Sequence, residues 1–274
     1  MIIDGKYVSS LIKNNLKAHI ESMKIDPTLA VIQIGNNEAS NIYIRNKEKY
    51  AKEIGASFVH IKYDENEDQN VVIDKIKELN NDDNINGIIV QLPLPKGFDT
   101  DLIVNTIDPY KDVDGLTELS IGKLCINKPL LMPCTPSGII YLLEYYNIPI
   151  ESKNVVIVGR SNLVGKPLFE MMLNKNATVT LCHSKTENLK SITSKADILV
   201  SAVGKKHIIT ADMVKKDAVV IDVGINKEDG KLYGDVDYNK VIKKASYITP
   251  VPGGVGPMTI AMLYSNLIKT YNLK

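Results

Sequence analysis

The feature that most constrains the fold is a repeated change between two spacings of apolar residues. Short strand-like runs, such as LAVIQIG at 29–35, alternate with longer segments whose apolar residues recur at helical spacing. Near-continuous apolar strands between amphipathic helices are typical of a mostly parallel sheet with helices on both faces. The first half of the chain is therefore predicted to contain helix 8–20, strand 29–35, helix 40–54, strand 57–63, helix 71–79 and strand 87–95.

The pattern is interrupted between about residues 106 and 133 and then resumes. Beyond the interruption the sequence predicts helix 136–146, strand 155–159, helix 164–173, strands at 177–182, 197–204 and 218–225, a short strand near 247 and a last helix at 258–267. The second series is typical of a doubly wound, Rossmann-like unit. We therefore expect an α/β protein with two domains, one made of 1–134 with 257–274 and the other of 135–256.

Composition argues against binding by bulk charge. The 274 residues include 33 Lys+Arg and 32 Asp+Glu, which gives a formal net charge of +1. Such a chain has no general attraction for nucleic acid or an anionic membrane surface, so neither partner is expected. Only Arg45 and Arg160 among the basic residues are arginine, and each is a candidate for a position where lysine does not serve.

The cysteines and the N-terminal segment indicate a reducing compartment. Cys125, Cys134 and Cys182 are odd in number and widely spaced, so we expect neither a disulfide framework nor a Cys-x-x-Cys metal site. The first residues include Asp4 and lack the apolar region of a secretory signal. The uncharged stretch 245–268 is interrupted by prolines and glycines, which oppose a membrane span. We expect a cytoplasmic protein without a metal site.

A glycine-rich turn connects strand 155–159 to the next helix. Such a turn presents backbone N–H groups and the positive end of a helix dipole to a phosphate. The glycine that follows Gly159 is Gly165, so the spacing is not G-x-G-x-x-G. A plain tight turn between strand and helix is the alternative.

The end of the next strand favours NADP over NAD. An NAD site usually has an acid there, about 20 residues beyond the turn, that holds the ribose 2′-OH. This chain has Cys182, His183, Ser184 and Lys185 instead, with no acid in reach. Together with Arg160 in the turn, Ser184 and Lys185 suit a 2′-phosphate, because guanidinium offers a planar fork to phosphate oxygens.

Ser40, Tyr43 and Lys47 share one stripe of the predicted helix 40–54. Lys47 lies on the more apolar side of that helix, and Tyr43 precedes it by one turn. A desolvated lysine has a lowered pKa and can take part in acid–base chemistry. The alternative is a structural lysine whose stem covers an apolar face.

Three further segments offer polar groups or close backbone approach. Gln91, at the end of a strand, can hydrogen-bond a ligand or the Lys47 ammonium, or can cap the next loop. Asp114 in DPYKDVDG can be a turn acid or can accept from a nitrogen heterocycle; no Glu follows where a calcium loop needs one. The segment PVPGGVGPMT at 250–259 lets backbone approach a flat ligand, or forms an interdomain crossover.

Taken together, these segments resemble the bifunctional methylenetetrahydrofolate dehydrogenase/methenyltetrahydrofolate cyclohydrolase (FolD) family. The matching segments, in the family's order from about residue 30 to 260, are IGNNEASNIYIRNK, GIIVQLPLP, DPYKDVDGL, MPCTPSG, VVIVGRSNLVGKP, ATVTLCHSKT, VIDVGIN and ITPVPGGVGPMT. The resemblance implies NADP-linked oxidation of 5,10-methylenetetrahydrofolate to the 5,10-methenyl cation, and hydrolysis to 10-formyltetrahydrofolate at the same site. It also implies a homodimer through the cofactor domain and a final helix that returns to the first domain.

The resemblance assigns roles residue by residue. It makes Lys47 the key catalytic lysine, with Tyr43 stacking on the folate, Gln91 tuning Lys47 and Asp114 holding the pterin ring. The other folate-binding positions that it implies are Ser40, Leu92, Pro252, Gly253, Gly254, Val255 and Gly256. The NADP-binding positions that it implies are Gly159, Arg160, Ser161, Ser184 and, on the nicotinamide side, Ile225.

Three rival functions can be set against this expectation. The first is a dehydrogenase with weak cyclohydrolase activity, which Lys47 with Gln91 opposes. The second is a catalytically silent nucleotide-binding relative, which the set of Tyr43, Lys47 and Asp114 opposes. The third is an unrelated shikimate- or amino-acid-type dehydrogenase, which leaves SNIYIRNK and PVPGGVGPMT unexplained.

Overall fold

The computed structural model describes residues 1–272, which form two compact units. One unit consists of Met1–Ser10 with Thr135–Thr259 and is called here the five-stranded unit, after its main sheet. The other consists of Leu11–Cys134 with the segment from Ile260 onward and is called the three-stranded unit. The predicted domain boundaries, with the ligand assigned to each domain, stay a prediction.

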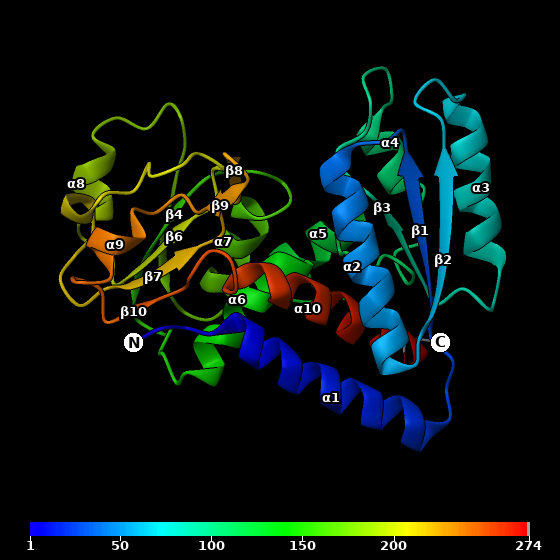
Figure 1. Cartoon of the computed structure of the whole chain (residues 1–274), viewed down its shortest axis with the longest axis horizontal. Coiled ribbons are helices and arrows are strands. Elements are labelled where there is room, and N and C mark those ends of the chain that lie inside the picture. Colours follow the sequence, from blue (N-terminus) through cyan, green and yellow to red (C-terminus); the bar gives the residue numbers. More distant parts are fainter. Residues whose placement is uncertain (273–274) are drawn as a thin grey trace. The chain divides into compact units, whose positions relative to one another are not determined.

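The three-stranded unit contains a parallel sheet in the order β2-β1-β3 (Figure 1). One face of the sheet packs on α3 and α4, where Ala30, Ile32 and Ile88 share a core with Ile76 and Ile103. Side chains alternate along a strand, and the intervening Leu29 and Val31 are also fully buried, so the opposite face is covered as well. The elements are β1 (Thr28–Ile34), α2 (Glu38–Ile54), β2 (Ser57–Tyr63), α3 (Gln69–Asn81), β3 (Gly87–Val90), α4 (Thr100–Asn105) and α5 (Glu118–Cys125).

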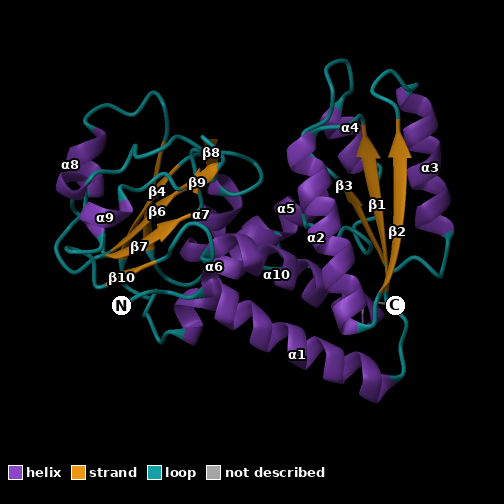
Figure 2. Cartoon of the chain, viewed as in Figure 1, coloured by secondary structure: helices purple, strands orange, loops and turns teal. Residues whose placement is uncertain are grey.

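The five-stranded unit contains a parallel sheet in the order β10-β7-β6-β4-β5. Figure 2 labels β10, β7, β6 and β4 of this sheet. The chain runs from β4 to the edge strand β5 and then returns to the other side of β4 with β6. This reversal is the switch point at which doubly wound folds bind ligands, beyond the carboxyl ends of the strands. The elements are β4 (Asn154–Val158), α7 (Gly165–Leu173), β5 (Thr178–Cys182), α8 (Leu189–Thr193), β6 (Ile198–Ser201), β7 (Val219–Asp222), the antiparallel pair β8 (Asn226–Glu228) and β9 (Lys231–Tyr233), α9 (Tyr238–Val241) and β10 (Tyr247–Ile248).

Three helices complete the described chain. They are α1 (Gly5–Met23), α6 (Cys134–Tyr145) and α10 (Val255–Lys269), and each supplies residues to both units. The predicted α/β class with a Rossmann-like second unit is confirmed. The predicted strands and helices occur in the predicted order, but the short helices α4, α8 and α9 were not predicted.

The structure differs from the prediction at the end of one strand and in several short elements. Strand β3 ends at Val90 rather than continuing to Pro95, because the prolines at 93 and 95 have no N–H to donate to a ladder. Helix α5 lies inside the interrupted stretch and begins at an N-cap, where the Thr117 side chain accepts from Ser120 N. The β8–β9 pair was not predicted either, because its strands are short and mostly exposed.

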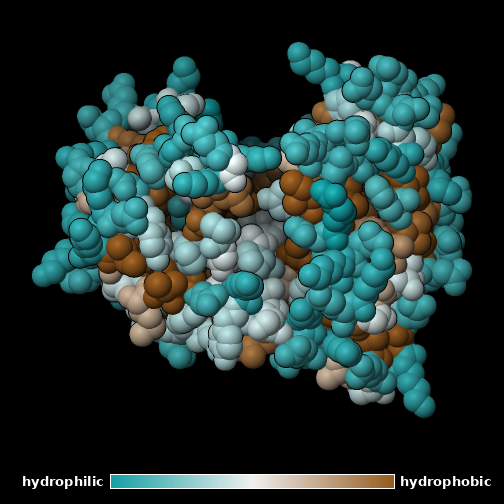
Figure 3. Space-filling view, in the orientation of Figure 1, coloured by the Kyte–Doolittle hydropathy of each residue, from teal (hydrophilic) through white to brown (hydrophobic). Residues whose placement is uncertain are grey.

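The face shown in Figure 3 carries mainly hydrophilic side chains, with apolar ones in small groups between them. Among residues 1–272, no helix combines the length and apolarity that crossing a membrane requires. Within the same residues, His, Cys, Asp and Glu side chains nowhere gather in a group of three or more that could hold a metal ion.

Candidate functional site

Lys47 and Gln91 form a direct hydrogen bond in the three-stranded unit. Lys47 Nζ donates to Gln91 Oε1 at 2.8 Å. The Gln91 side chain is itself oriented, because its Nε2 donates to Leu92 O at 2.8 Å. Its backbone N continues the sheet beyond β3 by donating to Ile32 O at 2.8 Å. A helix residue and a strand-end residue are thus brought together at the carboxyl edge of the sheet.

Helix α2, which carries Lys47, is capped at both of its ends. Asn37 caps the first turn by accepting from Ser40 N at 3.0 Å, and Gly55 ends the helix with φ +81. Ser40 is buried, and Tyr43, one turn before Lys47, is 37% exposed. Tyr43 therefore presents an aromatic ring that a flat ligand can stack upon.

Burial controls the titration of Lys47 and Asp114. Burial lowers the pKa of Lys47, although the nearby Asp114 and Cys134 oppose that shift. Burial likewise raises the pKa of Asp114, although Lys47 opposes it. Both shifts favour the neutral form of the side chain, because the cost of burying a charge outweighs the attraction between the two groups. Lys47 is neutral more often than an exposed lysine and can accept a proton from water.

Asp112 shapes the turn that carries Asp114. Its buried carboxylate accepts from Gly115 N at 2.9 Å, Thr117 N at 2.8 Å and Ser120 Oγ at 2.7 Å. Gly115 has φ +70, a conformation that favours glycine. These bonds fix the backbone on both sides of Asp114, so the direction of its side chain follows from the turn.

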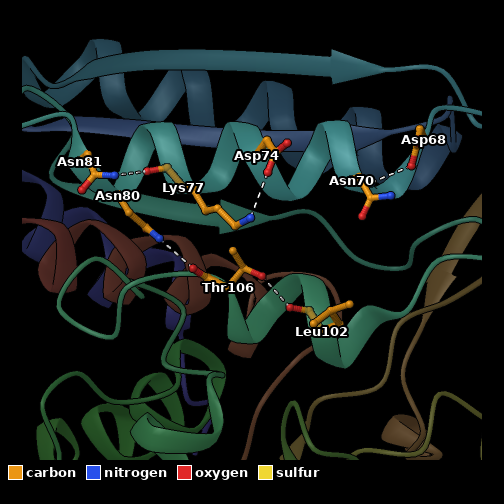
Figure 4. A network of polar contacts seen from close by, with 8 residues as sticks. All are labelled: Asp68, Asn70, Asp74, Lys77, Asn80, Asn81, Leu102 and Thr106. Carbon is orange, nitrogen blue, oxygen red and sulfur yellow. Dashed lines mark hydrogen bonds and ion pairs between the residues drawn. The ribbon is translucent and has the colours of Figure 1, made fainter.

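The C-terminal end of α3 holds the beginning of the same loop (Figure 4). Asn80 Nδ2 donates to Thr106 O at 2.7 Å, and Asn80 Oδ1 accepts from Asp108 N at 2.9 Å. Lys111 Nζ donates to two carbonyl oxygens at the end of α3, at 2.9 and 2.7 Å. The loop between α4 and α5 is therefore anchored before it reaches Asp114.

Two residues of α10 hold the backbone of the site through hydrogen bonds that the sequence did not predict. Tyr264 is fully buried, donates from Oη to Lys47 O at 2.8 Å and stacks on Tyr50 with ring centroids 5.2 Å apart. Asn266 Nδ2 donates to Val113 O at 2.9 Å and to Met132 O at 2.8 Å. Neither residue has a motif around it, so sequence reasoning had no signal for them.

Cys134 lies buried beside this loop. Its Sγ donates to Val113 O at 3.2 Å, and burial raises the pKa of the thiol well above its usual range. The thiol therefore stays protonated and serves as a compact hydrogen-bonding side chain of the loop rather than as a nucleophile.

The segment 250–256 belongs to the five-stranded unit and packs on the start of α1. Lys6 N donates to Gly253 O at 2.8 Å, and a Cβ placed on Gly5 would overlap the Gly254 carbonyl. Gly253 has φ +107, and Gly254 is buried. These glycines permit close backbone packing, and contact with a ligand stays a prediction for Pro252, Gly253, Gly254, Val255 and Gly256.

The turn after β4 has the geometry of a backbone cradle. Gly159 has φ +122, and a Cβ on Gly165 would overlap the Gly159 carbonyl. Ser161 Oγ accepts from Val164 N at 3.1 Å, and Ser161 O accepts from Lys166 N at 3.1 Å. The strand thus passes into α7 with the first helical turn held close to the Gly159 carbonyl.

Arg160 and Ser184 lie on neighbouring loops at the same edge of the sheet. Each follows its strand by two residues, and the last residues of those strands, Val158 and Cys182, are register partners. Both side chains are exposed, as is Ile225 beyond β7, at 47%. The structure therefore brings the predicted phosphate-binding residues of both loops to one edge.

The chain matches two family models. The model described as tetrahydrofolate dehydrogenase/cyclohydrolase, catalytic domain, matches residues 3–114. The model described as tetrahydrofolate dehydrogenase/cyclohydrolase, NAD(P)-binding domain, matches residues 133–274.

Full-length relatives give the same result. A protein of Agathobacter rectalis named bifunctional protein FolD is 51% identical over 272 residues, which cover 98% of each chain. The crystal structure of the bifunctional FolD methylenetetrahydrofolate dehydrogenase/cyclohydrolase of Campylobacter jejuni aligns with a TM-score of 0.97 at 45% identity, over 100% of this chain and 99% of that one. A Trypanosoma brucei FolD structure complexed with NADP cofactor and inhibitor aligns with a TM-score of 0.96 at 34% identity, over 100% and 97%.

Proposed function

Because the chain belongs to the tetrahydrofolate dehydrogenase/cyclohydrolase family, we propose that it catalyses two successive steps of one-carbon folate interconversion. The first is the NADP-dependent oxidation of 5,10-methylenetetrahydrofolate to the 5,10-methenyl cation. The second is the hydrolysis of that cation to 10-formyltetrahydrofolate. Membership of this family argues against the alternative of a shikimate- or amino-acid-type dehydrogenase.

The observation that carries the hydrolytic step is the partly buried hydrogen bond between Lys47 and Gln91. Removing hydride from the substrate creates a cation, and a permanently charged lysine beside it would oppose that step. Burial lowers the pKa of Lys47 and the neutral Gln91 supplies no charge that would restore the ammonium. A neutral Lys47 can take a proton from the water that attacks the methenyl carbon.

The remaining residues of the three-stranded unit bind and orient the folate in this proposal. Asp114 accepts hydrogen bonds from the N–H groups of the pterin, from a turn that Asp112 fixes. Tyr43 stacks on the substrate from its half-exposed position on α2. Ser40 precedes Lys47 on α2, and Leu92 directly follows Gln91. We assign both residues supporting contacts with the folate.

The cradle after β4 fits the pyrophosphate of NADP. Because Gly165 has no Cβ, the backbone of the turn at Gly159 lies close to the N-terminus of α7, where an anion is favoured. Arg160 and Ser184, with Lys185 next to them, would hold the ribose 2′-phosphate, and Ser161 would lie by the pyrophosphate. NADP supplies the hydride acceptor when bound, and Ile225 would line its nicotinamide side.

A homodimer through the cofactor domain, which the family resemblance implies, belongs to the same proposal. So does a cytoplasmic location, which the odd number and wide spacing of the cysteines favour. Light scattering on the purified chain tests the dimer directly. A mass of one chain, 30.3 kDa, would refute it.

One assay tests the proposed function. Purified protein is mixed with 5,10-methylenetetrahydrofolate and either NADP or NAD, and the methenyl and formyl products are followed separately. We expect both products with NADP. The methenyl product without enzyme-dependent formyl product would support the rival with weak cyclohydrolase activity, and the lack of both would support the catalytically silent one.

A further inference from the structure

Two buried carboxylates in the five-stranded unit have no part in the function described so far. Asp235, just after β9, is fully buried and accepts from Ser201 Oγ at 3.0 Å, Val203 N at 2.7 Å and Lys205 N at 2.8 Å. It is also approached by Asn226 Nδ2 at 3.3 Å. One carboxylate therefore gathers donors from the loop that follows β6 and from the start of β8.

Asp222, at the end of β7, holds Asp235 in return. Its carboxylate accepts from Asp235 N at 2.9 Å, Val236 N at 2.9 Å and Gly224 N at 3.1 Å. Asp222 N in turn donates to Thr249 Oγ1 at 2.7 Å. The two acids thus connect the ends of β7 and β9 through backbone N–H groups.

Two glycines make this reciprocal arrangement possible. A Cβ on Gly224 would overlap the Asp235 carboxylate, and a Cβ on Gly234 would overlap the Asp222 carboxylate. Each acid therefore occupies the space that the other segment's glycine leaves open. The motif VIDVGIN and the segment YGDVD are consequently two halves of one structural unit.

This unit lies at the ligand-binding edge of the sheet. Strand β6 neighbours β4, and a Cβ on Gly159 would overlap the carbonyl oxygen of Ala202 in the loop after β6. That loop is therefore packed against the cradle after β4. Arg160 and Ser184, which would hold the ribose 2′-phosphate, lie beyond β4 and β5. If NADP crosses the switch point from there, its nicotinamide half lies beyond β6 and β7.

We propose that Asp222 and Asp235 are positioning residues that hold the loops 201–205 and 224–226 in place for the nicotinamide half of NADP. The inference rests on the NADP-dependent function proposed above. Carboxylate oxygens accept several backbone N–H bonds at once, and bonds to a charged acceptor are stronger than neutral ones. An amide at position 235 offers one acceptor oxygen and turns an N–H₂ group toward donors, so the loop after β6 would lose its fixed path.

Asp235→Asn tests the proposal, with Asp229→Asn, at the exposed tip between β8 and β9, as the matched control. NADP binding is measured by calorimetry, and hydrolysis of methenyltetrahydrofolate is measured without any cofactor. We expect Asp235→Asn to weaken NADP binding by about tenfold, which is the usual effect of losing one hydrogen bond to a charged acceptor. The rate of hydrolysis should not change. The control should change neither quantity.

Two results would overturn the inference. One is unchanged NADP affinity, and the other is an equal loss of NADP affinity and hydrolysis, which would indicate general loss of structure. If Asp235→Asn does not fold, Ser201→Ala removes one donor and keeps both acids, and it should weaken NADP binding by a smaller factor. Unchanged affinity in that variant would then refute the proposal. A wild-type chain that binds no NADP would refute the proposed function itself, and is distinguishable on that ground.

Discussion

The Lys47 ammonium nitrogen lies 2.8 Å from Gln91 Oε1, and the other end of the same carboxamide is held by Leu92 O at 2.8 Å. The glutamine therefore points an acceptor at the lysine and cannot turn away without losing its own bond. A neutral acceptor orients Nζ and stabilises the ammonium less than a carboxylate would. This distinguishes the pair from a salt bridge, which would keep Lys47 protonated.

Lys47→Met should abolish the hydrolysis of the methenyl cation, because Lys47 is the base that the hydrogen bond to Gln91 Oε1 orients. A loss of about a hundredfold or more is the usual effect of removing a general base. Stopped-flow absorbance of the methenyl substrate measures it. Lys49→Met, an exposed lysine on the same helix, serves as the control and should retain the normal rate. Normal hydrolysis in Lys47→Met would refute the proposed mechanism.

Gln91→Glu should move the pH dependence of hydrolysis upward. Hydrolysis requires neutral Lys47, so its rate rises as the pH increases through the pKa of Lys47, which burial holds below the ordinary value. A carboxylate at position 91 favours the ammonium, and we expect the midpoint of the profile to rise by roughly one pH unit or more. Rates at several pH values give the midpoint for both proteins. An unchanged midpoint would mean that Lys47 is not the group that titrates.

The pairing of Lys47 with Gln91 was within reach of the sequence, although the two residues are 44 positions apart. Helical spacing placed Lys47 on the apolar side of α2, and the end of an apolar run placed Gln91 at the carboxyl edge of a parallel sheet. Both inferences need only local periodicity and one rule about where such sheets bind ligands. The fold class followed from the same periodicities.

The supports of the site were beyond such reasoning because they depend on the path of the backbone. Tyr264 reaches the carbonyl of Lys47 from a helix 217 positions later in the chain, and nothing in its neighbourhood indicates this. Asp222 and Asp235 meet only because the β8–β9 pair folds back between them. A local pattern records which face a residue takes, but it does not record which distant segment packs on that face.

Arg160→Ala should raise the KM for NADP much more than the KM for NAD. Arg160 is exposed beside the register partners that end β4 and β5, where a ribose 2′-phosphate would bind, and only NADP carries that phosphate. A charge-assisted bidentate contact contributes enough to change the KM for NADP by roughly tenfold or more. Initial rates with each cofactor measure both constants. Arg45→Ala, the other arginine, should affect neither, and equal effects of Arg160→Ala on both cofactors would refute the assignment.

Asp222 should make the stability of the five-stranded unit fall as the pH rises. Burial raises the pKa of Asp222 from 3.8 to about 6, so the folded state binds this proton more tightly than the unfolded state does. The unfolded chain therefore releases the proton near pH 4 and the folded chain near pH 6. Ionisation between these values costs the folded state about 3 kcal/mol, the free-energy equivalent of the difference between the two pKa values.

Urea unfolding of the wild type and of Asp222→Asn at pH values from 4 to 7 tests this expectation. The asparagine variant has its own cost of lost acceptors, but that cost does not depend on pH. The free energy of unfolding of the wild type relative to the variant should therefore decrease by roughly 2 to 3 kcal/mol across this range, and most of the change should occur below pH 6. A constant difference between the two proteins would mean that Asp222 is ionised in the folded chain throughout, with its charge fully offset by the N–H groups of Gly224, Asp235 and Val236.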